Sequence, residues 1–202
     1  MVILAATMRT AGAQTLPVAD DPRVAAVLQQ RTINASGNGA VPIHYADIVS
    51  AFSREDLLDQ VQAEYARMLK PGQKPEFVVQ KTGPRTYAYK NRKHEHSEIH
   101  ELFRGAAGTN RFEVEYYVSG ERFFGKFQSV ILVGVAPQDG AHSTYDVQVY
   151  AYPEAALPRF LARHLGLVER YFKSKTRDME RMATQICTRL CQPAAPAQVA
   201  SR

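Results

Sequence analysis

The sequence predicts a single α+β domain in which an antiparallel β-meander packs against a long C-terminal helix. Strand-like runs with turn signals between them fill the middle of the chain, and one helical apolar stripe then continues to about residue 190. Because strands and helices do not alternate singly, an antiparallel sheet is favoured over a doubly wound parallel one. The 202 residues suit one domain, the 45% hydrophobic content allows a packed core, and two cysteines exclude a disulfide-rich scaffold.

Two segments are expected to precede the domain. Residues 1–13 combine a short apolar run with Ala11 and Ala13, which resembles the second half of a secretory signal peptide and its cleavage site. The alternative is a mildly apolar N-terminus, since no basic stretch comes before the run. Residues 14–40 carry two prolines and two glycines and are expected to be a lead-in with one short helix at most. We therefore predict a periplasmic or secreted protein.

The α+β domain is expected to span residues 41–192, and its first helix is predicted to begin at Ser53. Serine is a favourable N-cap, and apolar residues recur at helical spacing over residues 57–69. Pro71 and the glycine after it are expected to stop this helix.

The middle of the chain is predicted to form the sheet. Two short strand-like runs lie at residues 77–79 and 86–89, and three stronger strands lie at 111–118, 122–135 and 145–151. Ser119-Gly120-Glu121 is expected to be the tight turn of a hairpin. Residues 94–104 fit either a short helix or a strand.

The long helix is predicted from Pro153, which ends the sheet, to about Leu190. Residues 159–190 carry eight basic and three acidic side chains, and this excess of five equals the formal charge of the whole chain. The basicity of the protein is therefore expected on the polar side of this helix. Residues 193–202, rich in proline and alanine, are expected to be a disordered tail.

Two cysteines lie near the end of the predicted helix. Cys187 and Cys191 are four residues apart and share one helical face. They are a candidate disulfide if the helix end unwinds in an oxidising compartment, and free thiols in the cytosol. Their spacing is not that of a C-x-x-C redox motif, so thiol catalysis is not predicted.

The passage from the last strand into the long helix reads YAYPEAALPRFL at residues 150–161, with Leu157, Pro158 and Leu161 at the entry to the helix. This stretch, with the order of elements over residues 110–190, resembles START-like, or helix-grip (polyketide cyclase-like), lipid-binding domains. The resemblance implies an antiparallel sheet wrapped around a long C-terminal helix, and an apolar ligand in a cavity between them. No binding residue carries over from the family.

Aromatic side chains of the sheet and the long helix are the candidate ligand-binding residues, because ligand pockets are largely apolar. The candidates are Phe112, Tyr116, Phe127, Tyr145 and Phe172. Packing in the core is their alternative role, and the sequence does not separate the two.

A second candidate surface lies on the basic side of the long helix. Arg170, Lys173 and Arg177 are expected to dock a partner protein or an anionic surface. A solvated helix face is the alternative interpretation of the same charges.

Two other patterns are weighed and set aside. His94, His96 and His100 lie among glutamates, and two of them would share a helical face, but a solvated polar segment is favoured over a metal site. Basic residues alternate with tyrosines between Lys81 and Lys93, as in some single-stranded nucleic acid sites. An exposed hairpin whose lysines protect a sheet edge is favoured, so a nucleic acid partner is not expected.

The glycine and lysine spacing of a phosphate-binding loop also occurs between Gly120 and Lys126. It lacks the serine or threonine after the lysine and lies within a predicted hairpin, so we reject it. With no catalytic motif, the sequence predicts an exported protein that binds an apolar small molecule or lipid between sheet and C-terminal helix, without catalysis, cofactor or transmembrane segment. The alternatives are an interaction module that uses the basic helix, and an enzyme of the same fold with a histidine or tyrosine as acid–base group.

Overall fold

A seven-stranded antiparallel sheet forms the centre of the protein, in the order β1-β7-β6-β5-β4-β3-β2. The structure is a computed structural model, and it describes residues 17, 19–75, 77–91, 95–122, 125–154, 170, 173–177, 184–185 and 187–191. The strands are β1 (Ile33–Val41), β2 (Phe77–Gly83), β3 (Thr86–Asn91), β4 (His96–Ala106), β5 (Phe112–Arg122), β6 (Gly125–Pro137) and β7 (Ser143–Pro153). The predicted α+β class with an antiparallel meander is confirmed.

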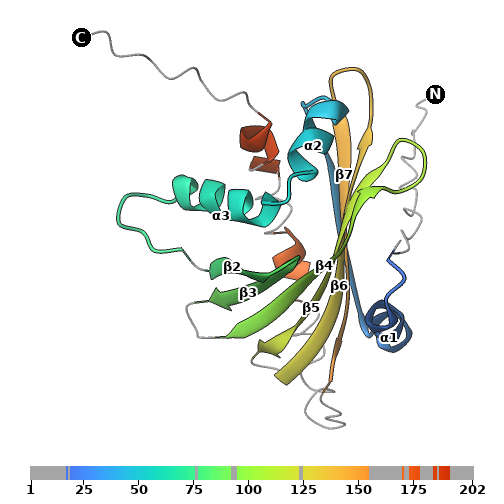
Figure 1. Ribbon diagram of the computed structural model, residues 1–202, viewed down its shortest axis with the longest axis vertical. Helices are drawn as coiled ribbons and strands as arrows, with labels where there is room; N and C mark the ends of the chain where they lie inside the picture. The colour runs from blue at the N-terminus through green and yellow to red at the C-terminus, as the bar shows by residue number, and fades with distance from the viewer. Residues whose placement is uncertain are drawn as a thin grey trace, which may run out of the picture.

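Helices cover both faces of this sheet (Figure 1). The helices are α1 (Pro22–Gln30), α2 (Tyr45–Phe52) and α3 (Leu57–Met68). We name the face toward α2 and α3 the inner face, and the face toward α1 the outer face. Beyond β7, residues 170, 173–177, 184–185 and 187–190 are helical, as the predicted C-terminal helix requires. The rest of that helix, the signal-like residues 1–13 and the tail 193–202 lie outside the described residues.

The alternation along β5 explains how the sheet divides its side chains between the two faces. Phe112, Val114 and Tyr116 belong to the inner core, where they pack with residues of β1, β6, β7, α2 and α3. Tyr117 points to the outer face and packs with Val130. Successive strand residues face opposite sides of a sheet, so one strand contributes to both layers.

Helix α1 exists because its apolar residues fall on one side and its first turn is capped. Asp21 precedes Pro22 and accepts a hydrogen bond from the backbone N–H of Arg23 at 2.8 Å. Val24 and Val27, 3% and 0% exposed, pack onto the outer face of the sheet. The helix therefore closes a second core that is separate from the inner one.

The lead-in prediction missed a strand. Residues 33–41 pair along their whole length with β7, from Ile33 opposite Ala151 to Val41 opposite Ser143. Alternating burial along β1, with Ile33, Ala35 and Val41 facing the core, provides the strand signal. Glycines at 37 and 39 and the polar residues Asn34, Ser36 and Asn38 hid this pattern, because such residues are typical of loops.

The predicted hairpin turn at Ser119-Gly120-Glu121 is wrong. Strand β5 continues to Arg122, and Gly120 pairs with Phe127 on β6. A side chain at position 120 would overlap the Ser97 hydroxyl and lie 2.6 Å from the His96 carbonyl oxygen. Gly120 therefore allows β4 and β5 to lie close together, and it does not form a turn.

Two boundaries of the predicted helices also change. Ser53 does not begin a helix: its N–H donates to the Val49 carbonyl at 2.9 Å and ends α2, a helix that the sequence analysis missed. Helix α3 begins after Asp56 instead. Residues 96–104 of the ambiguous segment 94–104 belong to β4, because their backbone pairs with β3 and β5 on either side.

Candidate functional site

The inner face of the sheet has an apolar floor that is incompletely covered. On β6, Val130 and Leu132 face α1 and are 0% exposed. Their neighbours Ile131 and Val133 face the inner side and are only partly buried. Because all four are aliphatic residues of one central strand, the difference lies in what covers each face. At β6, the outer face is fully covered, and the inner face retains some accessible apolar surface.

Other partly buried apolar side chains pack against the same inner core. They include Ile99 of β4, and Leu58 and Val61 of α3. Helix α3 is held to the sheet edge where the Val79 N–H donates to Gln62 Oε1 at 3.0 Å. The floor and these residues together define the inner site: Ile99, Ile131 and Val133 from the sheet, with Leu58 and Val61 from α3.

Four of the five predicted ligand-binding aromatics lie on the inner side of the sheet. Phe112, Tyr116 and Phe127 are 6%, 8% and 5% exposed and belong to the inner core. Tyr145 is partly buried, and its hydroxyl accepts a hydrogen bond from Thr184 Oγ1 at 3.2 Å. Phe172 lies outside the described residues. The structure gathers the four on one face, and their role in binding stays a prediction.

The enclosed space next to Tyr145 is small. A crevice of about 20 Å³ lies between α2, the sheet and the C-terminal helix, with Phe52, Val133, Tyr145 and Cys187 in its wall. This volume suits about one water molecule rather than a ligand. The end of the inner face near α2 is therefore packed, and accessible apolar surface begins at Val133 and Ile131.

A buried ion pair borders the inner site on β4. Arg104 Nε donates to Glu101 Oε1 at 3.0 Å and Arg104 Nη2 donates to Glu101 Oε2, while the two side chains are 7% and 3% exposed. Arg85, a mostly exposed residue, places its Nε 3.8 Å from Glu101 Oε1. A β-bulge after Glu101 brings the two partners onto the same face, because it shifts the alternation by one residue.

Two tyrosines lie beside this pair. Burial, together with the negative charge of Glu101, raises the pKa of the Tyr116 hydroxyl well above its usual range. The pKa of Tyr87, which is 1% exposed, is raised by burial first and then by Glu101. Both phenols therefore remain protonated and are hydrogen-bond donors at physiological pH.

A second guanidinium lies at the opposite end of the inner face. Arg122 is 6% exposed in its side chain and stacks over the rings of Tyr89 and Phe127 at 5.0 and 5.4 Å. Tyr89 in turn stacks on Phe77, and Phe77 on Tyr65 of α3. These contacts tie the β2–β3 hairpin to α3 and keep the sheet curled around the inner side.

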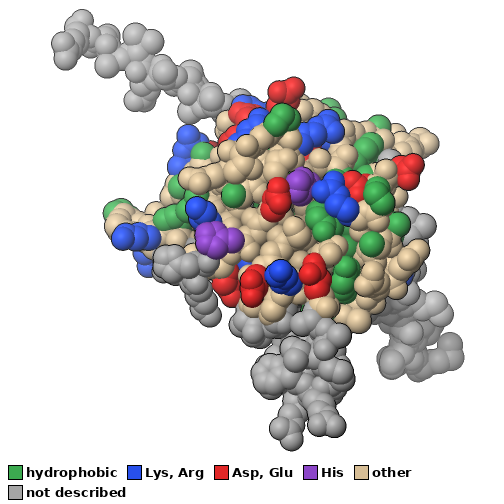
Figure 2. All heavy atoms as spheres, turned by 60° about the horizontal axis from the view of Figure 1, so that its bottom comes forward, with side chains coloured by type: hydrophobic (Ala, Val, Ile, Leu, Met, Phe, Trp, Pro, Cys, Tyr) green, Lys and Arg blue, Asp and Glu red, His purple; other side chains and the backbone are tan. Residues whose placement is uncertain are grey.

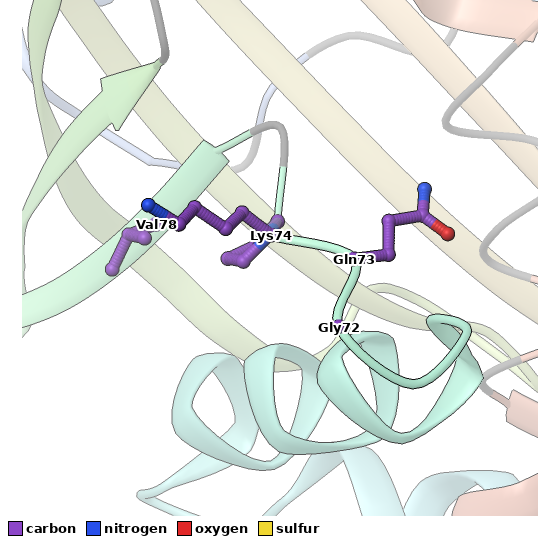
Figure 3. A pocket seen from close by; sticks show the side chains of 5 residues that line it. Gly72, Gln73, Lys74 and Val78 are labelled. Atoms are coloured by element: carbon purple, nitrogen blue, oxygen red, sulfur yellow. The ribbon is translucent and has the colours of Figure 1, made fainter.

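A wider hollow lies at the end of α3, outside the inner core. It measures about 670 Å³ and is lined by Gly72, Gln73, Lys74, Pro75 and Val78, of which Figure 3 labels four. The hollow is wide open to solvent and lies between the α3–β2 loop and the first residues of β2. Its lining from one loop offers little enclosure for a ligand.

The predicted partner-binding residues are exposed. Arg170, Lys173 and Arg177 lie on described helical residues, whereas Thr176 between them is 2% exposed. On the face of the molecule turned forward in Figure 2, basic and acidic side chains are interspersed rather than gathered in one basic patch. Exposure fits both a docking surface and a solvated helix face.

The predicted disulfide pair lies at the end of the C-terminal helix, and both cysteines are free thiols. The Cys191 N–H donates to the Cys187 carbonyl at 3.0 Å, so the backbone between them is helical. The hydrogen bond to Cys191 and burial in the inner core raise the pKa of the Cys187 thiol. Their pairing as a disulfide stays a prediction.

The histidines and the basic run fall on strands. His96 and His100 are four residues apart on β4, which separates them by about 13 Å along a strand, too far for a shared metal ion. His94 lies outside the described residues. In the basic run, Lys81 and Lys90 are exposed, while Tyr87 is buried and presents no ring on which a base could stack.

No protein-family model and no curated protein matches the sequence. Among solved structures, norcoclaurine synthase from Thalictrum flavum, in complex with dopamine and hydroxybenzaldehyde, has a TM-score of 0.52 and 13% identity, over 91% of this chain and 99% of that chain. Another structure of this synthase has a TM-score of 0.49 and 11% identity over 94% and 96% of the two chains. Ara h 8.0201 has a TM-score of 0.46 and 14% identity over 78% and 96%.

The first of these structures, together with the seven-stranded sheet, establishes an α+β helix-grip fold for this chain. The expected resemblance is confirmed at the level of fold. At 13% sequence identity, the similarity shows the fold alone. None of the helices in the described part of the chain is both long enough and apolar enough to cross a membrane.

Sequence reasoning missed the floor residues and the ion pair of the inner site. Ile131 and Val133 lie in a continuous apolar run, and such a run does not tell which face of a strand is covered. Glu101 and Arg104 are three residues apart, a spacing that places strand residues on opposite faces. Only the bulge brings them together, and no residue pattern predicts it.

Proposed function

We propose that this protein binds an apolar small molecule or lipid at the inner site, between the sheet and the C-terminal helix, without catalysing a reaction. The observation that carries the proposal is the partial exposure of Ile131 and Val133 next to the full burial of Val130 and Leu132. Solvent-accessible aliphatic surface on a central strand is unfavourable, at about 25 cal/mol per Å², and an apolar ligand would cover it.

The fold supports the same proposal. A sheet curled around helices leaves a concave space, and ligand pockets occur where apolar walls and a few polar groups converge. In this chain the apolar wall is the floor on β6, and the polar groups are those of Glu101, Arg104 and Tyr116. The structure of norcoclaurine synthase holds dopamine and hydroxybenzaldehyde, which makes small aromatic molecules a second ligand class to test.

Export is part of the proposal. The apolar run and small residues within residues 1–13 support a periplasmic or secreted location. Fractionation of cells that express the gene with its native upstream region tests it. Recovery of the protein from the periplasm or medium, shortened at its N-terminus, is expected, and recovery of the unshortened chain from the cytosol would contradict it.

Binding is tested with the neutral apolar dye Nile red and a matched pair of variants. Ile131→Trp and Leu132→Trp add the same bulk to adjacent residues that face opposite sides of β6. Ile131→Trp is expected to weaken dye binding about tenfold or more with little loss of stability, because the ring occupies free space at the inner site. Leu132→Trp is expected to cost about 1–3 kcal/mol of unfolding free energy and to leave the affinity of the folded protein unchanged.

Two results would overturn the proposal. The first is an absence of saturable Nile red binding by the unaltered protein. The second is a loss of stability in Ile131→Trp equal to that in Leu132→Trp, because the inner face would then be as tightly filled as the outer one.

A protein-interaction module is the second candidate, and the exposure of Arg170, Lys173 and Arg177 favours it. Charge reversal of all three to glutamate tests it by association with anionic vesicles at low salt. Loss of vesicle binding with unchanged Nile red affinity would support docking through the helix. Unchanged vesicle binding would contradict it.

A further inference from the structure

The described part of the inner face contains most of the unpaired buried polar atoms. Among the described residues, four buried side-chain atoms lack a hydrogen-bond partner: Ser97 Oγ, Ser129 Oγ, Arg104 Nη1 and Glu113 Oε1. The two serines and Arg104 face the inner side, and all three are hydrogen-bond donors. Buried polar groups are normally paired, so unpaired donors on one face indicate a partner that the protein itself does not supply.

Arg104 is the most informative of these donors. Its Nε and Nη2 are both used by Glu101, which leaves the two N–H groups of Nη1. The side chain is 7% exposed, so water is largely excluded from it. A buried N–H of a charged group costs more to leave unpaired than a neutral one, and an anionic acceptor satisfies it best.

The charge of the cluster also favours an anion. Two guanidinium groups, those of Arg104 and Arg85, lie within 4 Å of one carboxylate, that of Glu101. The nearby hydroxyls of Tyr87 and Tyr116 are neutral donors, as described above. Asp59 of α3 and Asp56, which precedes α3, act on Tyr87 more weakly than Glu101 and Arg104 do, and Asp56 is paired with Arg54. Among the three groups in contact, Arg85, Arg104 and Glu101, one positive charge is in excess.

The sheet register connects this cluster to the apolar floor. Arg104 is opposite Val114, and Val114 is opposite Val133. In the next row Glu101 is opposite Tyr116, which is opposite Ile131. Neighbouring strands are about 4.8 Å apart, so each row spans about 10 Å from the ion pair to the floor. One small molecule is long enough to contact both.

We propose that the ligand of the inner site is an amphiphilic acid, whose hydrocarbon or aromatic part covers Ile131 and Val133 and whose carboxylate, or an equivalent oxyanion, accepts hydrogen bonds from Arg104 Nη1. This inference rests on the proposed function, because it names the ligand class of the same site. Ser129 Oγ, on the strand of the floor, is a second donor for a polar substituent of the ligand.

The test compares dodecanoate with dodecanol as competitors of Nile red. The two share the same hydrocarbon chain, so their difference in affinity reports the headgroup alone. The unaltered protein is expected to bind dodecanoate about tenfold more tightly than dodecanol, which is the usual size of one charge-assisted hydrogen bond. Benzoate and benzyl alcohol form the parallel pair for an aromatic acid.

The informative variant is the double substitution Glu101→Gln with Arg104→Gln, because removal of Arg104 alone would leave a buried carboxylate without its partner. It is expected to bring the affinity ratio of dodecanoate to dodecanol close to one, because the loss of affinity falls mainly on dodecanoate. Arg85→Gln is the control: Arg85 is close to the same carboxylate but 63% exposed, so the ratio is expected to change less than about twofold.

The possible failures are distinguishable. Equal affinity for acid and alcohol in the unaltered protein, or a ratio that persists in the double variant, would overturn the amphiphilic acid and leave the apolar site standing. Failure of all four competitors to displace bound Nile red would likewise count against an acid ligand. If Nile red itself does not bind, the proposed function fails together with this inference.

Discussion

Arg111 on the edge of β5 reaches over Gly134 to Asp146 on β7, and its Nη1 lies 2.6 Å from Asp146 Oδ1. The same guanidinium donates from Nε to Glu113 Oε2 at 2.8 Å. Since Glu113, Gly134 and Asp146 are opposite one another on three successive strands, the arginine spans the width of all three. The Arg111 side chain can cross the middle strand, β6, only because Gly134 has no side chain.

Gly134→Ala is expected to destabilise the protein. A Cβ at this position would overlap the Arg111 guanidinium, so the arginine must leave Asp146 and the buried Glu113. We expect a loss of about 2–4 kcal/mol in the free energy of unfolding, measured by urea denaturation. Gly105→Ala is the control, because its Cβ would meet only Phe103 at 3.5 Å. Equal effects of the two substitutions would contradict this role of Gly134.

The features that the sequence predicted well are those with a local cause. The alternation of Phe112, Val114 and Tyr116 follows from the two-residue period of a strand, and their common face is confirmed. The outer core was not predicted, because Val24 and Val27 on a short helix do not show which surface they cover. Gly120 is predicted as a turn from its local sequence. The structure requires a glycine there because Ser97 lies against it, and Ser97 is 23 residues away in the chain.

The same limit applies to the inner site. Aromatic residues are predicted as ligand contacts because they are large and apolar, and three of them, Phe112, Tyr116 and Phe127, are buried in the inner core, where their role in binding stays a prediction. The partly exposed floor consists of Ile131 and Val133, which face the side of β6 opposite to that of Val130 and Leu132. Which elements cover each face of β6 is determined by the assembled fold, so a local sequence pattern does not predict it.

The stability of the protein is expected to depend on pH through Glu113. Burial, and then a hydrogen bond with Glu115, raises the pKa of Glu113 to about 7 from its usual 4.5, against the opposing effect of Arg111. The folded protein therefore holds this proton more tightly than the unfolded chain does. The resulting stabilisation is complete below about pH 4.5 and is lost as the pH rises to about 7.

Urea denaturation between these two pH values tests this dependence. The difference in unfolding free energy between the unaltered protein and Glu113→Gln is expected to fall with rising pH, because glutamine does not titrate. Glu121→Gln, at an exposed position of the same strand, is the control and is expected to give a constant difference. A flat difference for Glu113→Gln as well would refute the assignment.

Helix α1 is expected to contribute stability without affecting ligand binding. Val27 is 0% exposed in the outer core, so Val27→Ala is expected to cost about 2 kcal/mol of unfolding free energy. Nile red affinity is expected to stay unchanged, since the inner site lies on the other face of the sheet. Gln29→Ala changes an exposed residue of the same helix and is the matched control. Reduced dye affinity in folded Val27→Ala would mean that the two faces are coupled.

The two cysteines are expected to differ in reactivity. Cys187 is 7% exposed in the inner core, and its thiol pKa is raised. Cys191 is more accessible, and the hydrogen bond that it receives from Cys187 lowers the pKa of the Cys191 thiol. Since the thiolate is the reactive form, iodoacetamide is expected to alkylate Cys191 about tenfold faster than Cys187, as measured by mass spectrometry of the native protein. Cys191→Ser is expected to leave Cys187 slow, because burial alone protects it. Faster labelling of Cys187 would show that this end of the C-terminal helix does not stay packed against α2. Labelling of both cysteines only after addition of a reductant would show instead that they form the disulfide.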